Sequence, residues 1–238
     1  MASEAPAARQ LGRREVDASE LETVVLPTTS ARSQGERAYL LIRDRIITLK
    51  LAPGSVIEEA RLRSELELGR TPIREALQRL AHENLVSFVP HRGTFVTDIN
   101  LTDLRRLTEI RVVMEPYAAR LAAERAGQAD RTAIADLVDR LDAVGEADVQ
   151  ALMQLDQRIH RQVYQATHNP FLHAMLEETL NLSLRIWFLG LQRGVALKEA
   201  VEEHRRLLNG IRSGNPAMAE EAMREHVVGF EQAIRRVL

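Results

Sequence analysis

The stretch RTPIREALQRL, residues 70–80, decides the fold of the N-terminal part of the chain. Gly69 just before it is an acceptable N-cap, and Pro72 falls in the first helical turn, where its missing N–H costs nothing. The apolar residues recur at the i, i+3, i+4, i+7 spacing of one buried helix face: Ile73, Ala76, Leu77 and Leu80. The spacing therefore predicts a helix over about 70–83.

The face opposite these apolar residues is basic. Arg70 and Arg74 lie on it, and Thr71 lies at the N-terminal tip. A guanidinium suits a guanine edge or a phosphate, because it donates two parallel hydrogen bonds. A solvated face on an ordinary helix is the alternative, and the flanking sequence decides against it.

That flanking sequence predicts a complete DNA-binding module. Helices are expected over about 34–49 and 58–67, before the central helix. The stretch LVSFVPHRGTFV, residues 85–96, predicts a β-hairpin with a basic, glycine-containing tip. Helix-turn-helix followed by such a hairpin is a winged helix, which reads duplex DNA in the major groove. We expect His91, at the tip of the wing, to touch a phosphate or the minor groove.

Composition excludes several classes of protein. The 238 residues contain no cysteine, which rules out disulfides and thiolate metal sites and fits a cytoplasmic protein. Aromatic residues make up only 4%, which argues against a large β-sandwich. No apolar run approaches the roughly 20 residues that span a bilayer, and the N-terminus lacks the apolar core of a signal peptide. We therefore expect a cytoplasmic protein.

The charge is unevenly distributed. The whole chain has a net charge of −2, whereas residues 31–98 hold 11 Lys/Arg against 9 Asp/Glu, a net of +2. An excess this small makes one winged helix a weak electrostatic binder, so tight binding needs two copies or well-placed contacts.

The fold class predicted is mainly α, with an N-terminal winged helix-turn-helix and a C-terminal antiparallel all-helical bundle. Residues 1–32 lack a sustained period and are expected to be a disordered tail. Residues 33–98 form the DNA-binding domain, and residues 99–238 form the domain for effector, metal and dimer contacts. The predicted bundle helices cover about 100–126, 129–144, 147–167, 170–193, 197–212 and 215 to the C-terminus.

Four residues of this bundle are of types that bind metals, and their spacing along the sequence predicts that they lie close together. Asp156 and His160 are four apart, so they share one helix face. His204 lies 10 residues before Gly214, and His226 lies 11 residues after Asn215. In an antiparallel hairpin both would lie about 15 Å from the turn, hence side by side. Three imidazoles and one carboxylate can hold one divalent metal per chain, zinc first, with nickel, manganese or iron as other candidates. The alternative is that these are four unrelated polar residues.

A catalytic metal site would need a general base beside the metal. Glu203 and Glu225 directly precede His204 and His226, but adjacent helix residues point about 100° apart, so we expect neither glutamate on the ligand side. The sequence carries no nucleophile motif, phosphate loop or dinucleotide fingerprint. A ligand sensor therefore fits better than an enzyme. A metal-dependent hydrolase tethered to a DNA-binding module, and an architectural DNA binder whose bundle only dimerises, are the alternatives.

Taken together, these residues resemble the GntR superfamily of bacterial transcription regulators, in its FadR-like branch with an FCD effector domain. The resemblance covers about residues 34–236 and rests on five stretches: ELELGRTPIREALQRLAHENLV, PHRGTFV, LTEIRVVMEP, LDQRIHRQVYQATHNPFL and EEHRRLLNGIRSGNPAMAEEAMREH. The family usually has Gly-Val-Ser before Arg-Thr-Pro, where this chain has Glu67-Leu68-Gly69. The turn glycine and the serine cap are therefore displaced.

The resemblance implies a bacterial protein that is associated with the nucleoid when bound to DNA. It also implies a homodimer that binds an inverted-repeat operator on double-stranded DNA. It implies an effector that is a small organic acid, which controls operator affinity from a site at the metal. Arg111 is a candidate partner for the effector carboxylate, with a surface ion pair to Glu115 as the alternative. Asn181 and Arg185 are expected to line the same cavity. Implied DNA contacts come from Arg70, Thr71, Arg74, Arg79, Arg92 and Gly93; implied metal ligands are Asp156, His160, His204 and His226.

Overall fold

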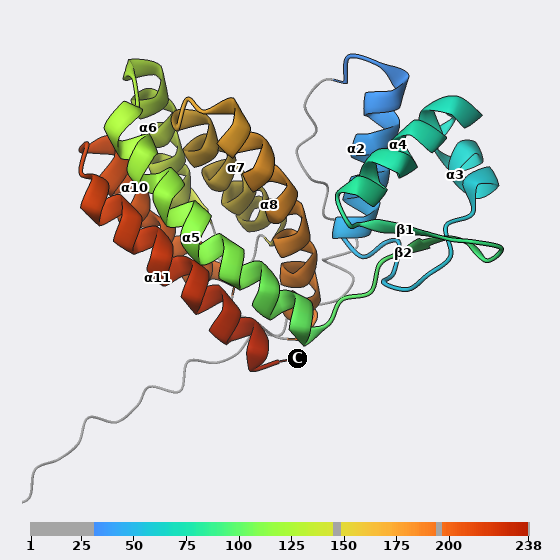
Figure 1. Cartoon of the computed structure of the whole chain (residues 1–238). Coiled ribbons are helices and arrows are strands. Elements are labelled where there is room, and N and C mark those ends of the chain that lie inside the picture. The colour runs from blue at the N-terminus through green and yellow to red at the C-terminus, as the bar shows by residue number, and fades with distance from the viewer. Residues whose placement is uncertain (1–30, 145–148, 194–196, 238) are drawn as a thin grey trace, which may run out of the picture.

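The computed structural model describes residues 31–144, 149–193 and 197–237, which form a winged helix-turn-helix and a helical bundle (Figure 1). The predicted tail, residues 1–32, lies almost entirely outside the described residues. The N-terminal unit consists of α2 (Gln34–Ile47), α3 (Glu59–Leu66), α4 (Arg70–His82), β1 (Val86–Val89) and β2 (Gly93–Val96). The predicted fold class, mainly α with a small N-terminal wing, is confirmed.

The turn between α3 and α4 departs from the family's usual sequence but keeps a tight geometry. Glu67 is the C-cap of α3 and adopts the left-handed region with φ 54°, a conformation in which glycine carries no steric penalty. Gly69 is the N-cap of α4 in an extended conformation and offers no side chain to the helix N-terminus. The turn therefore forms without the glycine and the serine at their usual places.

The wing is a two-stranded antiparallel hairpin. Val86 pairs with Val96 and Val89 pairs with Gly93, so the loop between the strands is short. Gly93 has φ 111°, a value that residues with a side chain rarely adopt, and a Cβ there would meet nothing within 4 Å. The backbone conformation of the wing tip therefore requires the glycine, and no close contact of its Cα does.

The bundle contains seven helical segments in the described part of the chain. They are α5 (Leu101–Arg125), α6 (Gln128–Ala143), α7 (Val149–Ala166), α8 (Pro170–Leu191), α9 (Leu197–Glu202), α10 (His204–Arg212) and α11 (Pro216–Arg235). The predicted caps form, because the side chains of Asn169 and Asn215 accept backbone N–H bonds at the starts of α8 and α11. The single helix predicted over 197–212 is instead interrupted at Glu203.

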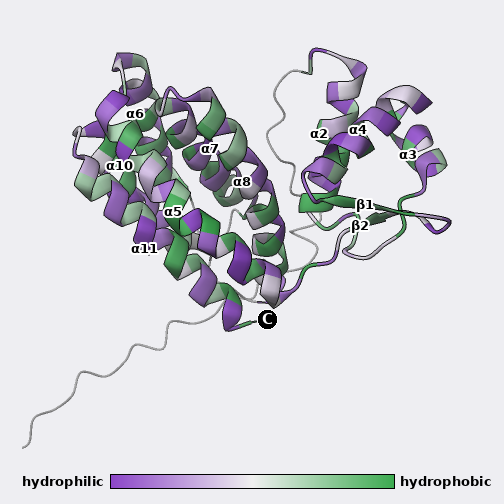
Figure 2. Ribbon diagram, viewed as in Figure 1, coloured by the Kyte–Doolittle hydropathy of each residue, from purple (hydrophilic) through white to green (hydrophobic). Residues whose placement is uncertain are grey.

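One continuous apolar core fills the bundle, and a second, smaller one fills the winged helix. Each bundle helix carries both hydrophilic and hydrophobic residues (Figure 2). The single tryptophan, Trp187, is buried and packs on Phe230 with ring centroids 5.3 Å apart. In the described part of the chain, no helix is both long and apolar enough to cross a membrane.

The two units are in contact. Ile47 at the end of α2 belongs to the core of the bundle, and Leu182 of α8 packs partly against the core of the winged helix. Arg185 of α8 is buried and donates hydrogen bonds to the Thr97 hydroxyl at 2.7 Å and to the Thr97 carbonyl. The connection after the wing is therefore bonded directly to the bundle.

Candidate metal centre and nucleic-acid interface

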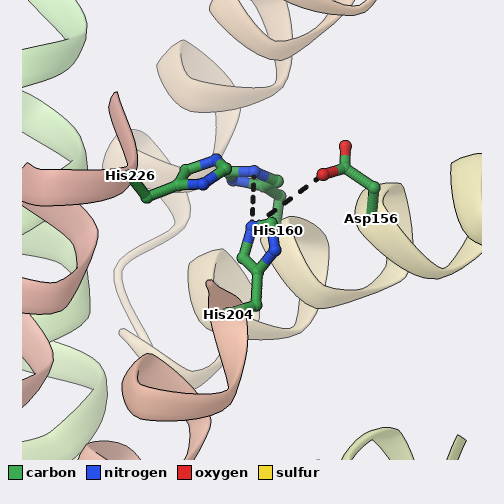
Figure 3. Close-up of side chains that lie close together, drawn as sticks. All are labelled: Asp156, His160, His204 and His226. Atoms are coloured by element: carbon green, nitrogen blue, oxygen red, sulfur yellow. Dashed lines mark hydrogen bonds and ion pairs between the residues drawn. The ribbon is translucent and has the colours of Figure 1, made fainter. Parts of the chain in front are cut away.

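Four buried side chains meet inside the bundle: Asp156, His160, His204 and His226. One ligand atom from each can be chosen so that all four lie within 4.8 Å of one another. Figure 3 shows that the four side chains come from three segments and converge on a common point. The group is the one predicted from sequence spacing.

Local sequence explains the convergence. Asp156 and His160 lie one helical turn apart on α7 and are both buried. His204 begins α10, and His226 lies in α11, with their ring centroids 4.1 Å apart. At Gly210 of α10, a Cβ would come within 2.8 Å of the Ala219 backbone nitrogen, so only glycine permits this approach of the two helices. The close crossing brings the two histidines to the same level.

Two of the histidines have their ring orientation fixed by a second partner. His204 Nδ1 lies 3.2 Å from the Val201 carbonyl, which accepts only, so this nitrogen carries the proton and Nε2 keeps a free lone pair. His160 Nδ1 lies 3.3 Å from the Glu115 carboxylate and 3.3 Å from the Tyr164 hydroxyl. A carboxylate or carbonyl behind a ligating histidine is the usual arrangement at metal sites.

The Nε2 ends of these two buried rings face each other at a separation that fits one shared ion. The Nε2 atoms of His160 and His204 are 3.2 Å apart. Two nitrogens that each lie about 2.0–2.1 Å from one ion at a tetrahedral angle would be separated by about 3.3 Å. Asp156 Oδ1 lies 3.9 Å from His204 Nε2. The donor set and its spacing therefore fit a divalent metal.

The protonation states favour cation binding. Burial holds the pKa of His204 and of His226 well below the usual histidine value; His226 and His160 add to this effect at His204, and His160 and Arg111 add to it at His226. Both rings are therefore neutral at pH 7 and have lone pairs to offer. Burial raises the pKa of Asp156, while His160 and Arg111 oppose this effect.

Glu203 corrects one prediction. We expected neither Glu203 nor Glu225 to face the ligands, yet Glu203 Oε2 lies 3.4 Å from His226 Nδ1. Glu203 lies at the interruption between α9 and α10, so the reasoning from a continuous helix does not apply. Its carboxylate is behind the third histidine, with a half-exposed side chain. Glu225 instead pairs with Arg206 at 2.5 Å, as expected of a surface residue.

Arg111 and Glu115 form an ion pair inside the bundle, not on its surface. Arg111 Nε donates to Glu115 Oε1 at 2.5 Å, and both side chains are at most 3% exposed. Burial opposes ionisation of Glu115, but Arg111 and His160 outweigh it and lower the pKa of this carboxyl well below its usual value. Arg111 Nη1 is buried without a hydrogen-bond partner among the described residues. The guanidinium, which also lies over the Phe230 ring at 4.8 Å, therefore keeps one N–H group without a hydrogen-bond partner among the described residues.

The other two candidate effector residues lie on α8, and the structure separates them. Asn181 is buried, and its Oδ1 has no hydrogen-bond partner among the described residues. Arg185 lies about one turn further along the helix and binds Thr97 instead, so its guanidinium faces the winged helix. The expectation that Arg185 lines the effector cavity is corrected by this placement. Burial lowers the pKa of Arg185 to about 10.

The predicted DNA-contacting residues of α4 differ in whether their side chains already contact other residues of the protein. Arg70 and Thr71 are exposed in the first turn of α4. Arg74 is also half-exposed, but its Nε donates to Glu59 of α3 at 3.1 Å. Arg79 lies over the Tyr39 ring at 3.6 Å and bonds to Glu83 at 3.2 Å. It therefore braces α4 against α2 in this structure.

The wing presents the basic tip that the sequence predicts. His91 and Arg92 are exposed in the turn between the strands, and His91 has φ 61°. The Arg92 guanidinium lies 5.8 Å from the centre of the Phe95 ring, near enough for a weak cation–π contact. Together with the first turn of α4, this tip gives the unit two basic surfaces.

Comparison with known proteins decides the family. Residues 106–229 match the FCD domain, and residues 34–96 match the bacterial regulatory proteins of the gntR family. The HTH-type transcriptional repressor GlaR of Escherichia coli is 30% identical over 200 residues, which cover 80% of this chain and 90% of GlaR. The chain is a GntR-family transcriptional regulator with an FCD domain.

Further relatives of this regulator agree. The HTH-type transcriptional regulator LutR of Bacillus subtilis is 27% identical over 208 residues, 78% of this chain and 94% of LutR. The solved structure of E. coli McbR/YncC has the same fold, with a TM-score of 0.74 and 21% identity over 86% of this chain and 98% of that one. The matched gntR family, GlaR and LutR are transcriptional regulators and not enzymes, which confirms that prediction and leaves the hydrolase alternative unsupported.

Proposed function

We propose that this regulator senses a small organic acid at a divalent metal held by Asp156, His160, His204 and His226, and that the acid changes its affinity for an operator. The observation that carries the proposal is that the Nδ1 atoms of His160 and His204 both face other protein groups, which leaves their Nε2 atoms toward the cluster. His204 Nδ1–H donates to the Val201 carbonyl, and His160 Nδ1 lies 3.3 Å from the Glu115 carboxylate, so the Nε2 atoms of both rings are left facing each other 3.2 Å apart.

The residues around the metal group support an acidic ligand. When bound, the metal would supply open coordination positions that attract a carboxylate. Arg111 adds a buried guanidinium whose Nη1 has no partner among the described residues. Arg111 also affects the pKa of Asp156 and of His226, so its charge acts at the metal group itself. A metal and a guanidinium together favour an anion over a neutral ligand.

On the DNA side, we propose that Arg70, Thr71 and Arg74 enter the major groove while His91, Arg92 and Gly93 contact the backbone or the minor groove. Arg79 would support α4. One module with a net charge of +2 gains from being linked to a second, so we propose a homodimer on an inverted-repeat operator. The cytoplasmic location expected from the sequence stays part of this proposal.

A thermal-shift screen of organic acids on the metal-loaded protein tests the effector. A true effector stabilises the native state by RT ln(1 + [L]/Kd), about 2.7 kcal/mol at a hundredfold excess over Kd. The same acid should change operator affinity at fixed salt and should lose its effect in His204→Ala/His226→Ala. The bundle variant His168→Ala/His173→Ala is the matched control. An acid that stabilises both variants equally would contradict binding at the metal group.

A further inference from the structure

The four side chains of the metal group are buried, so a cation needs a path through the protein to reach them. His204 is 0% exposed, and the two most exposed of the four, Asp156 and His226, reach only 6% and 5%. Figure 3 shows His226 at the edge of the group that lies away from Asp156. A path that reaches His226 from the surface therefore reaches the metal group.

A cavity of about 490 Å³ lies beside His226, between α10 and α11. Its lining includes His226 itself, Asn209 of α10 and three glutamates, Glu202, Glu203 and Glu225. The Asn209 amide oxygen is buried and has no hydrogen-bond partner among the described residues. The cavity therefore brings carboxylate and amide oxygens up to one side chain of the metal group.

One of the three glutamates is free of cationic partners. Glu202 lies 2.9 Å from Arg205, and Glu225 lies 2.5 Å from Arg206. The Glu203 side chain is 52% exposed, and no arginine or lysine pairs with it in the described part of the chain. An exposed carboxylate whose charge is not compensated attracts cations from solution.

Glu203 and His226 are separated by the distance expected of two ligands of one ion. Glu203 Oε2 lies 3.4 Å from His226 Nδ1, and this nitrogen makes no hydrogen bond to any described residue. An oxygen and a nitrogen that each lie about 2.0–2.1 Å from a zinc ion at a tetrahedral angle would be about 3.3 Å apart. The pair can therefore share a cation outside the buried group.

Gly229 of α11 leaves the space that the Glu203 carboxylate occupies. It follows His226 by three residues and so lies on the same face of α11. A Cβ added at Gly229 would lie 3.6 Å from Glu203 Oε2, so a longer side chain would displace the carboxylate. A glycine inside a helix costs about 1 kcal/mol relative to alanine, and the place of Glu203 gives this one a packing reason.

We propose that Glu203 and the Nδ1 atom of His226 form an entry site that takes a divalent cation from water and passes it to the buried group. This inference rests on the proposed function, because it requires the buried metal site. In the entry site, the neutral His226 ring offers a lone pair at Nδ1 and carries its proton at Nε2. When His226 turns to binding through Nε2, water carries the proton to Nδ1, and Glu203 accepts the new hydrogen bond.

The kinetics of Zn²⁺ release from the loaded full chain test the proposal. Release into an excess of a fluorescent chelator gives the dissociation rate constant, and competition with the same chelator gives the equilibrium dissociation constant. Glu203→Gln removes the charge but keeps an oxygen that accepts from His226 Nδ1–H. Because entry and exit follow one path, it should slow association and release by at least about tenfold each, with the equilibrium constant changed less than about threefold.

Two further variants show whether the charge must be at this position. Glu202→Gln is the matched control, since it removes the same charge from the same cavity and leaves Arg205 paired with Asp142 at 2.7 Å. It should change the release rate less than about twofold, because Glu202 does not contact the metal group. Glu203→Asp keeps the charge on a shorter side chain and should release Zn²⁺ faster than Glu203→Gln.

Each other result would overturn a defined part of the proposal. Faster release from Glu203→Gln, with a raised equilibrium constant, would show that Glu203 only supports the His226 ring. Equal slowing in Glu202→Gln would show that any negative charge in the cavity suffices. An unchanged release rate in Glu203→Gln would overturn the entry site and leave the buried site standing. A wild type that binds no Zn²⁺ would overturn the buried site and the entry site together.

Discussion

The winged helix and the bundle place their charged residues in opposite ways. In the winged helix, Arg70 and Arg92 are exposed, and the core beneath them is apolar. In the bundle, the candidate site consists of ionisable groups inside the core, with Glu115 and His204 both 0% exposed. Charge that attracts a polyanion acts best at the surface, whereas a site for one ion and one small acid benefits from exclusion of water. Substitutions at the charged residues of the winged helix should therefore change DNA binding without changing stability. Substitutions at the buried charged residues of the bundle should change both ligand binding and stability.

The largest effect expected concerns Glu115. Glu115→Ala should lower the free energy of unfolding by about 3–5 kcal/mol, because it leaves Arg111 buried and unpaired. Urea unfolding followed by the fluorescence of Trp187 reports on the bundle. Asp136→Ala is the control: its exposed pair with Arg140 has the same i,i+4 spacing and should cost only about 0.3–0.5 kcal/mol.

A second variant guards against a bundle that simply fails to fold. Arg111→Met/Glu115→Leu removes both charges and should be more stable than Glu115→Ala, since no unpaired charge remains. Equal losses in Glu115→Ala and Asp136→Ala would contradict the contrast between the buried and the exposed pairs.

The next effect separates DNA binding from stability. Arg70→Ala should weaken binding to an operator, selected from a random duplex library, by about 1–3 kcal/mol while the melting temperature stays unchanged. Arg74→Ala should weaken it less, because Arg74 gives up an ion pair with Glu59 when it turns to DNA. Fluorescence anisotropy at fixed salt measures both. Arg140→Ala removes the same charge from the bundle and should have no effect; similar losses in all three variants would refute a specific role for α4.

The smallest effect expected lies where the two units meet. Arg185→Ala removes the hydrogen bonds to Thr97 and should cost about 0.5–1.5 kcal/mol, since the cost of burying the guanidinium offsets part of their value. Hydrogen exchange should increase at the connection, residues 97–100, and not within α4. Unchanged exchange there would show that Arg185 does not hold the connection.

The sequence predicts those features that depend on spacing along a single element. The apolar repeat over 70–80 is enough to place α4, and the four-residue interval from Asp156 to His160 is enough to put both on one face. The pairing of His204 with His226 was also predictable, because Gly214 and Asn215 mark the turn between their helices. Local chemistry fixes each of these features.

Features that depend on packing were missed. Nothing in the spacing of Arg111 and Glu115 distinguishes a buried pair from a surface pair, since only the neighbouring helices decide burial. The prediction that Glu203 points away from the ligand residues was wrong, because the interruption between α9 and α10 contains no glycine or proline that would indicate it in the sequence. Arg185 was assigned to the wrong side of α8, which is buried on more than one face. A contact with Thr97, which lies 88 residues away in the chain, leaves no local signal.

The metal content of the purified protein tests the central claim most directly. Elemental analysis by mass spectrometry should find about one divalent metal per chain in the wild type and in His168→Ala/His173→Ala, whose histidines lie outside the cluster. His204→Ala/His226→Ala should retain almost none and should melt at a lower temperature, because ligation contributes to folding. Full metal content in His204→Ala/His226→Ala, or none in the wild type after purification without chelators and addition of Zn²⁺, would contradict the account.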